Sequence, residues 1–290
     1  MVTKKSVASE IISLSSIKGM VEAYEEIAAM RINRTQDAVL KSRVFTQEIN
    51  DIFQHVKSSA KKEIARIMKI KKIKDRKNLS FLEKNGKTLF VYLSSNTGLY
   101  GDIIKRTFDL FAKYVDGLSD NVVIIGKLGL KIASERGISQ PITYFDFPDN
   151  SVDEAQLQKI AAYLIGFERV IVFYGLFESI LHQKEAMLDI SGNSPPTQVQ
   201  EEIKIKYFFE PGIDKILAFF EKEIFSSILE QVIRESQLAK FSSRVVELDS
   251  AIENINKELK RAIFKKRRLR HEEANKKQLQ TLSSISLWRT

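Results

Sequence analysis

The chain has 290 residues, 43% of them hydrophobic, and a formal net charge of +9 at pH 7. This length supports one large domain or two smaller ones, and the positive charge favours an acidic partner such as nucleic acid, an anionic membrane or an acidic protein surface. The absence of cysteine excludes disulfides and thiolate chemistry. No apolar run reaches the roughly 18 residues of a membrane span, and the N-terminus lacks a signal-peptide core, so we expect a cytoplasmic protein or one docked to a membrane from that side.

The N-terminal segment predicts one long helix, because no glycine or proline occurs between Met20 and Asn85 and both residues disfavour helix interiors. An apolar stripe runs along it through Leu14, Ile17, Val21, Tyr24, Ala28, Ala38, Phe45, Ile49, Ile52 and Val56. Arg31, Thr35 and Ser42 interrupt this stripe, so it is the weaker of two such patterns in the chain.

The centre alternates between apolar runs and helical patterns. Strands are predicted at 88–93, 121–126, 142–147 and 169–175, with helices at 103–115, 127–136 and 153–165. This alternation indicates a mostly parallel sheet with helices on its faces. Residues 204–210 predict a further edge strand, and 190–198 predict an exposed loop.

The C-terminal segment carries no glycine or proline after Gly212 and shows a heptad pattern. Its apolar seam consists of Leu238, Phe241, Val245, Leu248, Ile252, Ile255, Leu259 and Ala262. We therefore predict an α/β protein in which N- and C-terminal helices form a long antiparallel coiled coil beside a central Rossmann-like α/β domain. The expected segments are 1–78, 79–210 and 211–290, and the alternative is that both helices belong to an ordinary bundle.

The stretch SSNTGLYGDIIKRTF, residues 94–108, follows the first strand where a phosphate loop would lie. A P-loop needs Gly-Lys-Ser/Thr after its glycines, but Gly101 is followed by Asp102 and Lys105 comes too late. The glycines are better explained by a tight turn and close helix packing. Residues 126–131 lack the P-loop spacing, His182 is an isolated histidine, and no GxSxG motif occurs. We therefore predict no catalytic, cofactor-binding or metal-binding residues.

The positive charge is concentrated in two runs. Residues 57–77 hold ten basic and two acidic side chains, and residues 260–277 hold nine and two. Nucleic acid would suit them, but few aromatic residues interleave to stack on bases. An acidic protein collar, anionic lipid headgroups or a merely solvated helix face fits as well.

Several motifs in order resemble the gamma subunit of rotary F-type ATP synthases, as a divergent bacterial member. They are SSNTGLYGDI, IGKLG, VFYGLFESILHQ, FFEPGIDKIL and ESQLAKFSSRVVELDSAIENI, with IKGMVEAYEEIAAM near the N-terminus. Tyr100 stands where the family has a cysteine, and the segment from Arg270 to Asn275 departs from the family pattern.

The resemblance implies a central-stalk rotor that couples proton-driven rotation of a membrane ring to ATP synthesis or hydrolysis. The partners would be the alpha and beta subunits of the hexamer, the epsilon subunit and the ring of c subunits, and not nucleic acid. The chain itself would be non-catalytic, with ATP, ADP and Mg on partner subunits and no cofactor of its own. It would lie peripherally at the cytoplasmic face of the bacterial plasma membrane.

The resemblance also assigns contact residues. Met30, Arg31, Arg244, His271 and Asn275 match family positions that engage the hexamer, and Tyr207 and Glu210 match the foot that touches the ring. Two other hypotheses remain open at this point: a basic coiled-coil protein that binds nucleic acid, and an α/β enzyme with helical extensions.

Overall fold

The computed structural model describes residues 3–59, 82, 84–115, 121–138, 140–191, 210 and 212–287. The chain forms two compact units. The smaller unit combines Met1–Ala29 with Arg244–Thr290, and the larger unit is Met30–Ser243. Two long helices, α1 (Lys4–Ser59) and α6 (Ile213–Leu287), contribute to both units. Among the described helices, none combines the length and apolar character that a membrane crossing requires.

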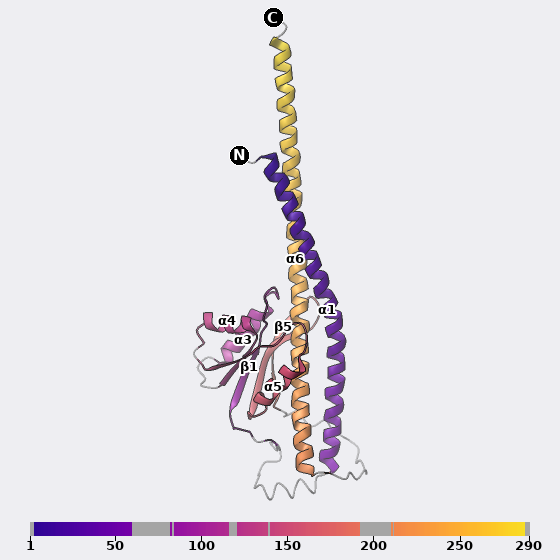
Figure 1. The fold of residues 1–290 in the computed structure, drawn as a ribbon, viewed down its shortest axis with the longest axis vertical. Helices are drawn as coiled ribbons and strands as arrows, with labels where there is room; N and C mark the ends of the chain where they lie inside the picture. The colour runs from indigo at the N-terminus through magenta and orange to yellow at the C-terminus, as the bar shows by residue number, and fades with distance from the viewer. Residues whose placement is uncertain are drawn as a thin grey trace. The chain divides into compact units, whose positions relative to one another are not determined.

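The unit Met30–Ser243 contains a five-stranded sheet of order β3-β2-β1-β4-β5 (Figure 1). The strands are β1 (Thr88–Leu93), β2 (Asn121–Ile125), β3 (Ile142–Phe145), β4 (Arg169–Phe177) and β5 (Gln183–Asp189). The first four are parallel, with Val91 of β1 opposite both Val123 and Val172. The predicted mostly parallel sheet is therefore confirmed.

The sequence-based prediction missed β5, which pairs antiparallel with β4 at the edge of the sheet. Its sequence, QKEAMLD, is mostly polar, and all of its residues are half-buried or exposed, so it lacks the apolar run that indicated the other strands. The adjoining prediction of an exposed loop is wrong at its first residue, since Ile190 is fully buried. The predicted strand at 204–210 lies outside the described residues except for Glu210, which is exposed.

Helices cover both faces of the sheet, as predicted. On one face, α5 (Glu154–Leu164) and α6 bury residues such as Leu157 and Leu229 against Val91 and Val172. On the other, α3 (Ile103–Val115) packs Phe111 against Tyr92 and Phe173. The short helix α4 (Lys127–Glu135) follows β2. Strand side chains alternate between the two faces, so both are apolar.

The coiled-coil seam of α6 is confirmed, because Leu238, Phe241, Leu248 and Ala262 are buried. The remaining predicted members are half-buried: Val245, Ile252, Ile255 and Leu259. The pairing with α1 is antiparallel within the larger unit, where Phe53 contacts Phe220 and Arg43 contacts Glu235. In the smaller unit Lys4 contacts Glu273 at 3.0 Å.

The predicted stripe of α1 is partly wrong. Its members Ile17, Tyr24, Phe45 and Ile52 are exposed. Its members Ala28 and Val56 are buried, together with four residues that the prediction did not include: Val7, Ile32, Val39 and Phe53. Thr35 and Ser42, which the sequence suggested as interruptions, are half-buried members of the true seam. Apolar residues occupy two neighbouring stripes of α1, and the prediction combined them.

Candidate functional site

The carboxyl ends of β1 and β4 are the place where an open parallel sheet usually binds a ligand, because the strand order reverses there. In this chain α6 occupies that place. All nine residues from Glu235 to Ser243 are at most 6% exposed. A helix that is buried on every side has neighbours all around it. We call residues 235–243, together with the loops they contact, the junction.

The loop after β1 begins the junction, and its backbone amides face a carboxylate of the same chain. Asp149, in the loop between β3 and α5, accepts hydrogen bonds from the amides of Asn96 and Thr97 at 2.9 Å each. The Thr97 hydroxyl donates a third at 2.8 Å. Amides of such loops hold phosphate oxygens in nucleotide-binding folds. Here the buried Asp149 carboxylate takes that place.

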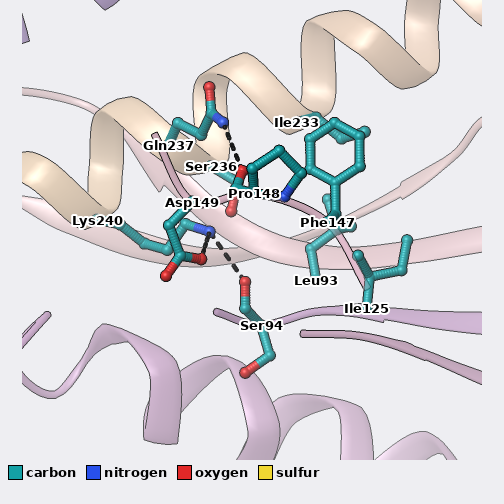
Figure 2. A pocket seen from close by; sticks show the side chains of 10 residues that line it. All are labelled: Leu93, Ser94, Ile125, Phe147, Pro148, Asp149, Ile233, Ser236, Gln237 and Lys240. Atoms are coloured by element: carbon teal, nitrogen blue, oxygen red, sulfur yellow. Dashed lines mark hydrogen bonds and ion pairs between the residues drawn. The ribbon is translucent and has the colours of Figure 1, made fainter. Parts of the chain in front are cut away.

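Lys240 connects α6 to the same point (Figure 2). Its ammonium donates to the carbonyl oxygen of Ser94 at 2.9 Å and lies 4.0 Å from a carboxylate oxygen of Asp149. The ammonium also lies 5.9 Å from the ring centroid of Tyr100. A buried charge is tolerated only when such partners replace water. Gln237 adds hydrogen bonds to the carbonyl groups of Pro148 and Ser151 on the same side.

The space left at this point is small. The cavity lined by Leu93, Phe147, Ile233 and Lys240 has a volume of about 20 Å³. That volume holds about one water molecule, whereas pockets for small molecules usually measure about 300–1,000 Å³. The junction therefore works as packed contact between α6 and the sheet.

A second polar contact joins α6 to α1. Arg43 donates two hydrogen bonds to one carboxylate oxygen of Glu235, at 2.9 and 2.6 Å, and Gln231 donates a third at 3.2 Å. Burial, with the nearby charge of Glu235, raises the pKa of Tyr174 in β4 to about 12. Glu235 thus lies where α1, α6 and the sheet meet.

Close backbone approach explains the glycines of IGKLG. A Cβ atom on Gly129 would lie 2.5 Å from the Cβ atom of Ser94, and one on Gly126 would lie 2.7 Å from the backbone nitrogen of Ser95. In the loop after β1, Gly101 has a φ of 61°, which fits the predicted tight turn, but Gly98 has open space around it. The predicted close packing therefore belongs to the second motif and not to Gly98.

None of the residues that the resemblance assigned to partner contacts is among residues 235–243, although Arg31 packs against Phe241 of the junction. Met30 is 59% exposed, whereas Arg31 is half-buried with its guanidinium 5.6 Å from the ring centroid of Phe241. Arg244 is half-buried, and His271 and Asn275 are exposed. His271 follows Arg244 on the same helix by 27 residues (271 − 244), or roughly 40 Å at 1.5 Å per residue. Tyr207 lies outside the described residues.

Sequence reasoning assigned no site role to Glu235, Lys240 and Asp149 of the junction or to Arg43 of α1. Glu235 and Lys240 occur in the motif ESQLAKFSSRVVELDSAIENI, but Arg43 and Asp149 belong to no quoted motif. One signal was available, because Lys240 stands between Leu238 and Phe241 of the predicted seam. Among the described residues, no group of three or more His, Cys, Asp and Glu side chains could hold a metal ion.

Comparison with known proteins gives a consistent result. A family model described as ATP synthase matches residues 3–276. Two similar curated proteins are named ATP synthase gamma chain: one from Halothermothrix orenii, 23% identical, and one from Cytophaga hutchinsonii, 26% identical, each match covering 88% of both chains. The gamma chain of Pelagibacter ubique is 22% identical over 98% of both chains.

Two solved structures share the fold. A chain of the Tetrahymena thermophila mitochondrial ATP synthase, from a structure of its central stalk and c-ring, superposes with a TM-score of 0.54 at 14% identity, covering 80% of this chain and 99% of that one. A chain of the Euglena gracilis mitochondrial ATP synthase gives 0.50 at 13% identity, covering 89% and 94%.

Proposed function

This chain belongs to the ATP synthase family, whose gamma chains it resembles over most of its length, and from that premise we propose that it is the central-stalk rotor of a rotary ATP synthase. Proton flow would turn a membrane ring, and the α/β domain resting on that ring would turn with it. The coiled coil would carry the rotation into a hexamer of alpha and beta subunits. The relatives named above give the nucleic-acid alternative no support.

The observation that carries this proposal is the junction. A rotor must transmit rotation from one of its parts to another without slipping. The nine buried residues of α6 have neighbours on every side, and polar contacts to α1 and to the end of β1 hold them on two sides. Because α6 is one continuous helix to Leu287, rotation imposed at the junction is carried along its length.

The rotor acts mechanically in this proposal, and the nucleotides and Mg belong to the partner subunits. A rotor shifts each catalytic site only if it contacts the conformations of that site differently. The C-terminal part of α6 offers an accessible, charged surface, since its basic run at 260–277 is exposed at nearly every position. Such a surface would suit acidic segments of the beta subunits.

We assign partner contacts on the same basis. Met30, Arg31, Arg244, His271 and Asn275 would engage the hexamer, and the exposed Glu210 with Tyr207 would touch the ring. The epsilon subunit would complete the stalk. The complex would be membrane-bound, with this chain as a peripheral, non-catalytic subunit at the cytoplasmic face of a bacterial plasma membrane.

Reconstitution tests the proposal. The purified chain is mixed with an alpha–beta hexamer from the same source, the complex is isolated, and ATP hydrolysis is measured with and without the chain. We expect one copy per hexamer and an altered turnover rate. A well-folded chain that fails to bind a well-folded hexamer would contradict the proposal, and binding to DNA in preference to other polyanions would favour the alternative.

A further inference from the structure

Apolar contacts bury one face of a helix, but they define its rotational position less narrowly than directional contacts do. Hydrophobic burial is non-directional and depends on the area removed from water. A hydrogen bond, in contrast, requires a donor and an acceptor within narrow limits of distance and angle. The polar contacts of the junction therefore refine the rotational position of α6, whose apolar face, with Leu229 and Ile233, already packs against the sheet.

The two charged side chains that α6 contributes to the junction point to different neighbours. Glu235 accepts hydrogen bonds from Arg43 of α1, whereas Lys240 donates to Ser94 at the end of β1. Five residues separate them (240 − 235), which corresponds to roughly 140° around an α-helix with 3.6 residues per turn. Two directional contacts on different sides of one helix resist its rotation about its own axis.

Folding alone does not explain why a lysine stands at position 240. An apolar side chain of similar length would fill the same volume without the cost of burying an ammonium group. Asp149 does not depend on Lys240 for its hydrogen bonds, because Asn96 and Thr97 already donate to it. Lys240 therefore adds direction to the contact in addition to compensating the buried charge of Asp149.

We propose that Lys240 is a positioning residue that fixes the rotational position of α6 against the α/β domain, through the carbonyl oxygen of Ser94 and the carboxylate of Asp149. This proposal rests on the proposed rotor function. In that function, the angle between the domain and α6 determines which surface of the helix each catalytic subunit meets when the ring stops. Loss of the contact allows the helix to lag behind the domain, so that part of each rotation is not transmitted.

The test uses the whole membrane complex, reconstituted with this chain and the partner subunits of the same source. ATP-driven proton pumping is measured per ATP hydrolysed in the same vesicles. Lys240→Met removes the charge and keeps the length, and Lys240→Arg is the conservative variant. Lys257→Met is the matched control, because that lysine lies on the same helix in an exposed pair with Glu253.

We expect Lys240→Met to lower the pumping ratio several-fold, Lys240→Arg to restore most of it, and Lys257→Met to leave it unchanged. Lys240→Met should also lower the thermal midpoint of the purified chain, because it leaves the buried Asp149 carboxylate without its cation, so the pumping ratio is measured at a temperature at which the variant chain is folded and assembled. An unchanged pumping ratio in Lys240→Met would overturn the proposal. If Lys240→Met fails to fold, Lys240→Gln takes its place, and failure of both variants to fold would equally overturn it, because Lys240 would then be needed for folding.

Failure of the rotor function itself would look different. If the complex with the wild-type chain hydrolyses ATP but pumps no protons, or if the wild-type chain does not assemble, the proposed function is wrong. The positioning role is rejected separately, by a coupled wild-type complex whose Lys240→Met counterpart is coupled to the same degree.

Discussion

Two stretches of α6 have opposite surroundings although they belong to one helix. Residues 235–243 are buried on all sides, whereas residues 270–283 are exposed at every position. The buried stretch, ESQLAKFSS, is rich in small side chains, and its two charged residues both have partners. The exposed stretch, RHEEANKKQLQTLS, consists mainly of long polar side chains.

The buried stretch packs α6 against the rest of the chain, and the exposed stretch is available to contact a partner. Small side chains let neighbouring elements approach the helix closely, so the junction can be packed around its whole circumference. Long charged side chains stay in water and remain available to a partner. Substitutions in the first stretch should therefore change the stability of the isolated chain, and substitutions in the second should not.

The largest expected contrast compares two phenylalanines of α6. Phe241 is 1% exposed in the junction, and Phe264 is 71% exposed. Phe241→Ala should lower the free energy of unfolding by about 3–5 kcal/mol, because it leaves a cavity. Phe264→Ala should change it by about 0.5 kcal/mol or less. Urea denaturation of the isolated chain measures both changes. Equal losses of unfolding free energy would contradict the difference between the buried and the exposed stretch.

Substitution of two glycines by alanine should change the stability of the chain in opposite directions. Gly129→Ala places a Cβ atom 2.5 Å from that of Ser94, and overpacking of this kind costs about 1–3 kcal/mol. Gly19 lies within α1 with nothing near its missing Cβ atom, so Gly19→Ala should stabilise by roughly 0.5–1 kcal/mol. Thermal melts should move in opposite directions, and a stabilising Gly129→Ala would contradict the close approach.

Ion pairs provide a third comparison. Arg43→Ala removes the main partner of the buried Glu235 carboxylate and should cost about 1–2 kcal/mol, since Arg43 is itself half-exposed. Lys257→Ala removes the partner of the exposed Glu253 and should cost about 0–0.5 kcal/mol. Urea denaturation at low ionic strength distinguishes the two, because urea does not screen charges, provided that both variants keep the wild-type slope. A cost at Lys257 as large as that at Arg43 would argue against burial as the cause.

The smallest expected effect depends on pH. The folded chain holds the Tyr174 proton more tightly than the unfolded chain, where the pKa lies near 10. The stability that Tyr174 contributes is therefore fully present below about pH 10 and is lost as pH rises towards about 12. Tyr174→Phe should reduce the decline in stability across this window. Parallel declines in the two proteins would show that Tyr174 does not contribute.

The regular spacing of apolar residues predicted the elements that bury a continuous apolar face. The four parallel strands and the seam of α6 follow from apolar spacing alone, because each buries a continuous face. It failed for β5, where an edge strand carries polar residues, and for α1, where two apolar stripes lie side by side. The predicted division into 1–78, 79–210 and 211–290 stays a prediction.

The junction could not be predicted in the same way. Lys240, Asp149 and Ser94 are far apart in the sequence and meet only because α6 crosses the ends of the strands. Nothing in the spacing of Asp149 distinguishes it from a surface residue of a loop. The family resemblance identified the fold around these residues, but it assigned functional contacts elsewhere, and those assignments stay predictions.

Rotation of the α/β domain within the assembled complex is the most direct test of the rotor. The chain has no cysteine, so Leu181→Cys on the exposed β4–β5 turn gives a single site for attaching a bead. With the alpha–beta hexamer fixed to a surface and supplied with ATP, the account predicts stepwise rotation of the bead in one direction. A bound chain whose bead shows only random motion while the hexamer hydrolyses ATP would contradict it.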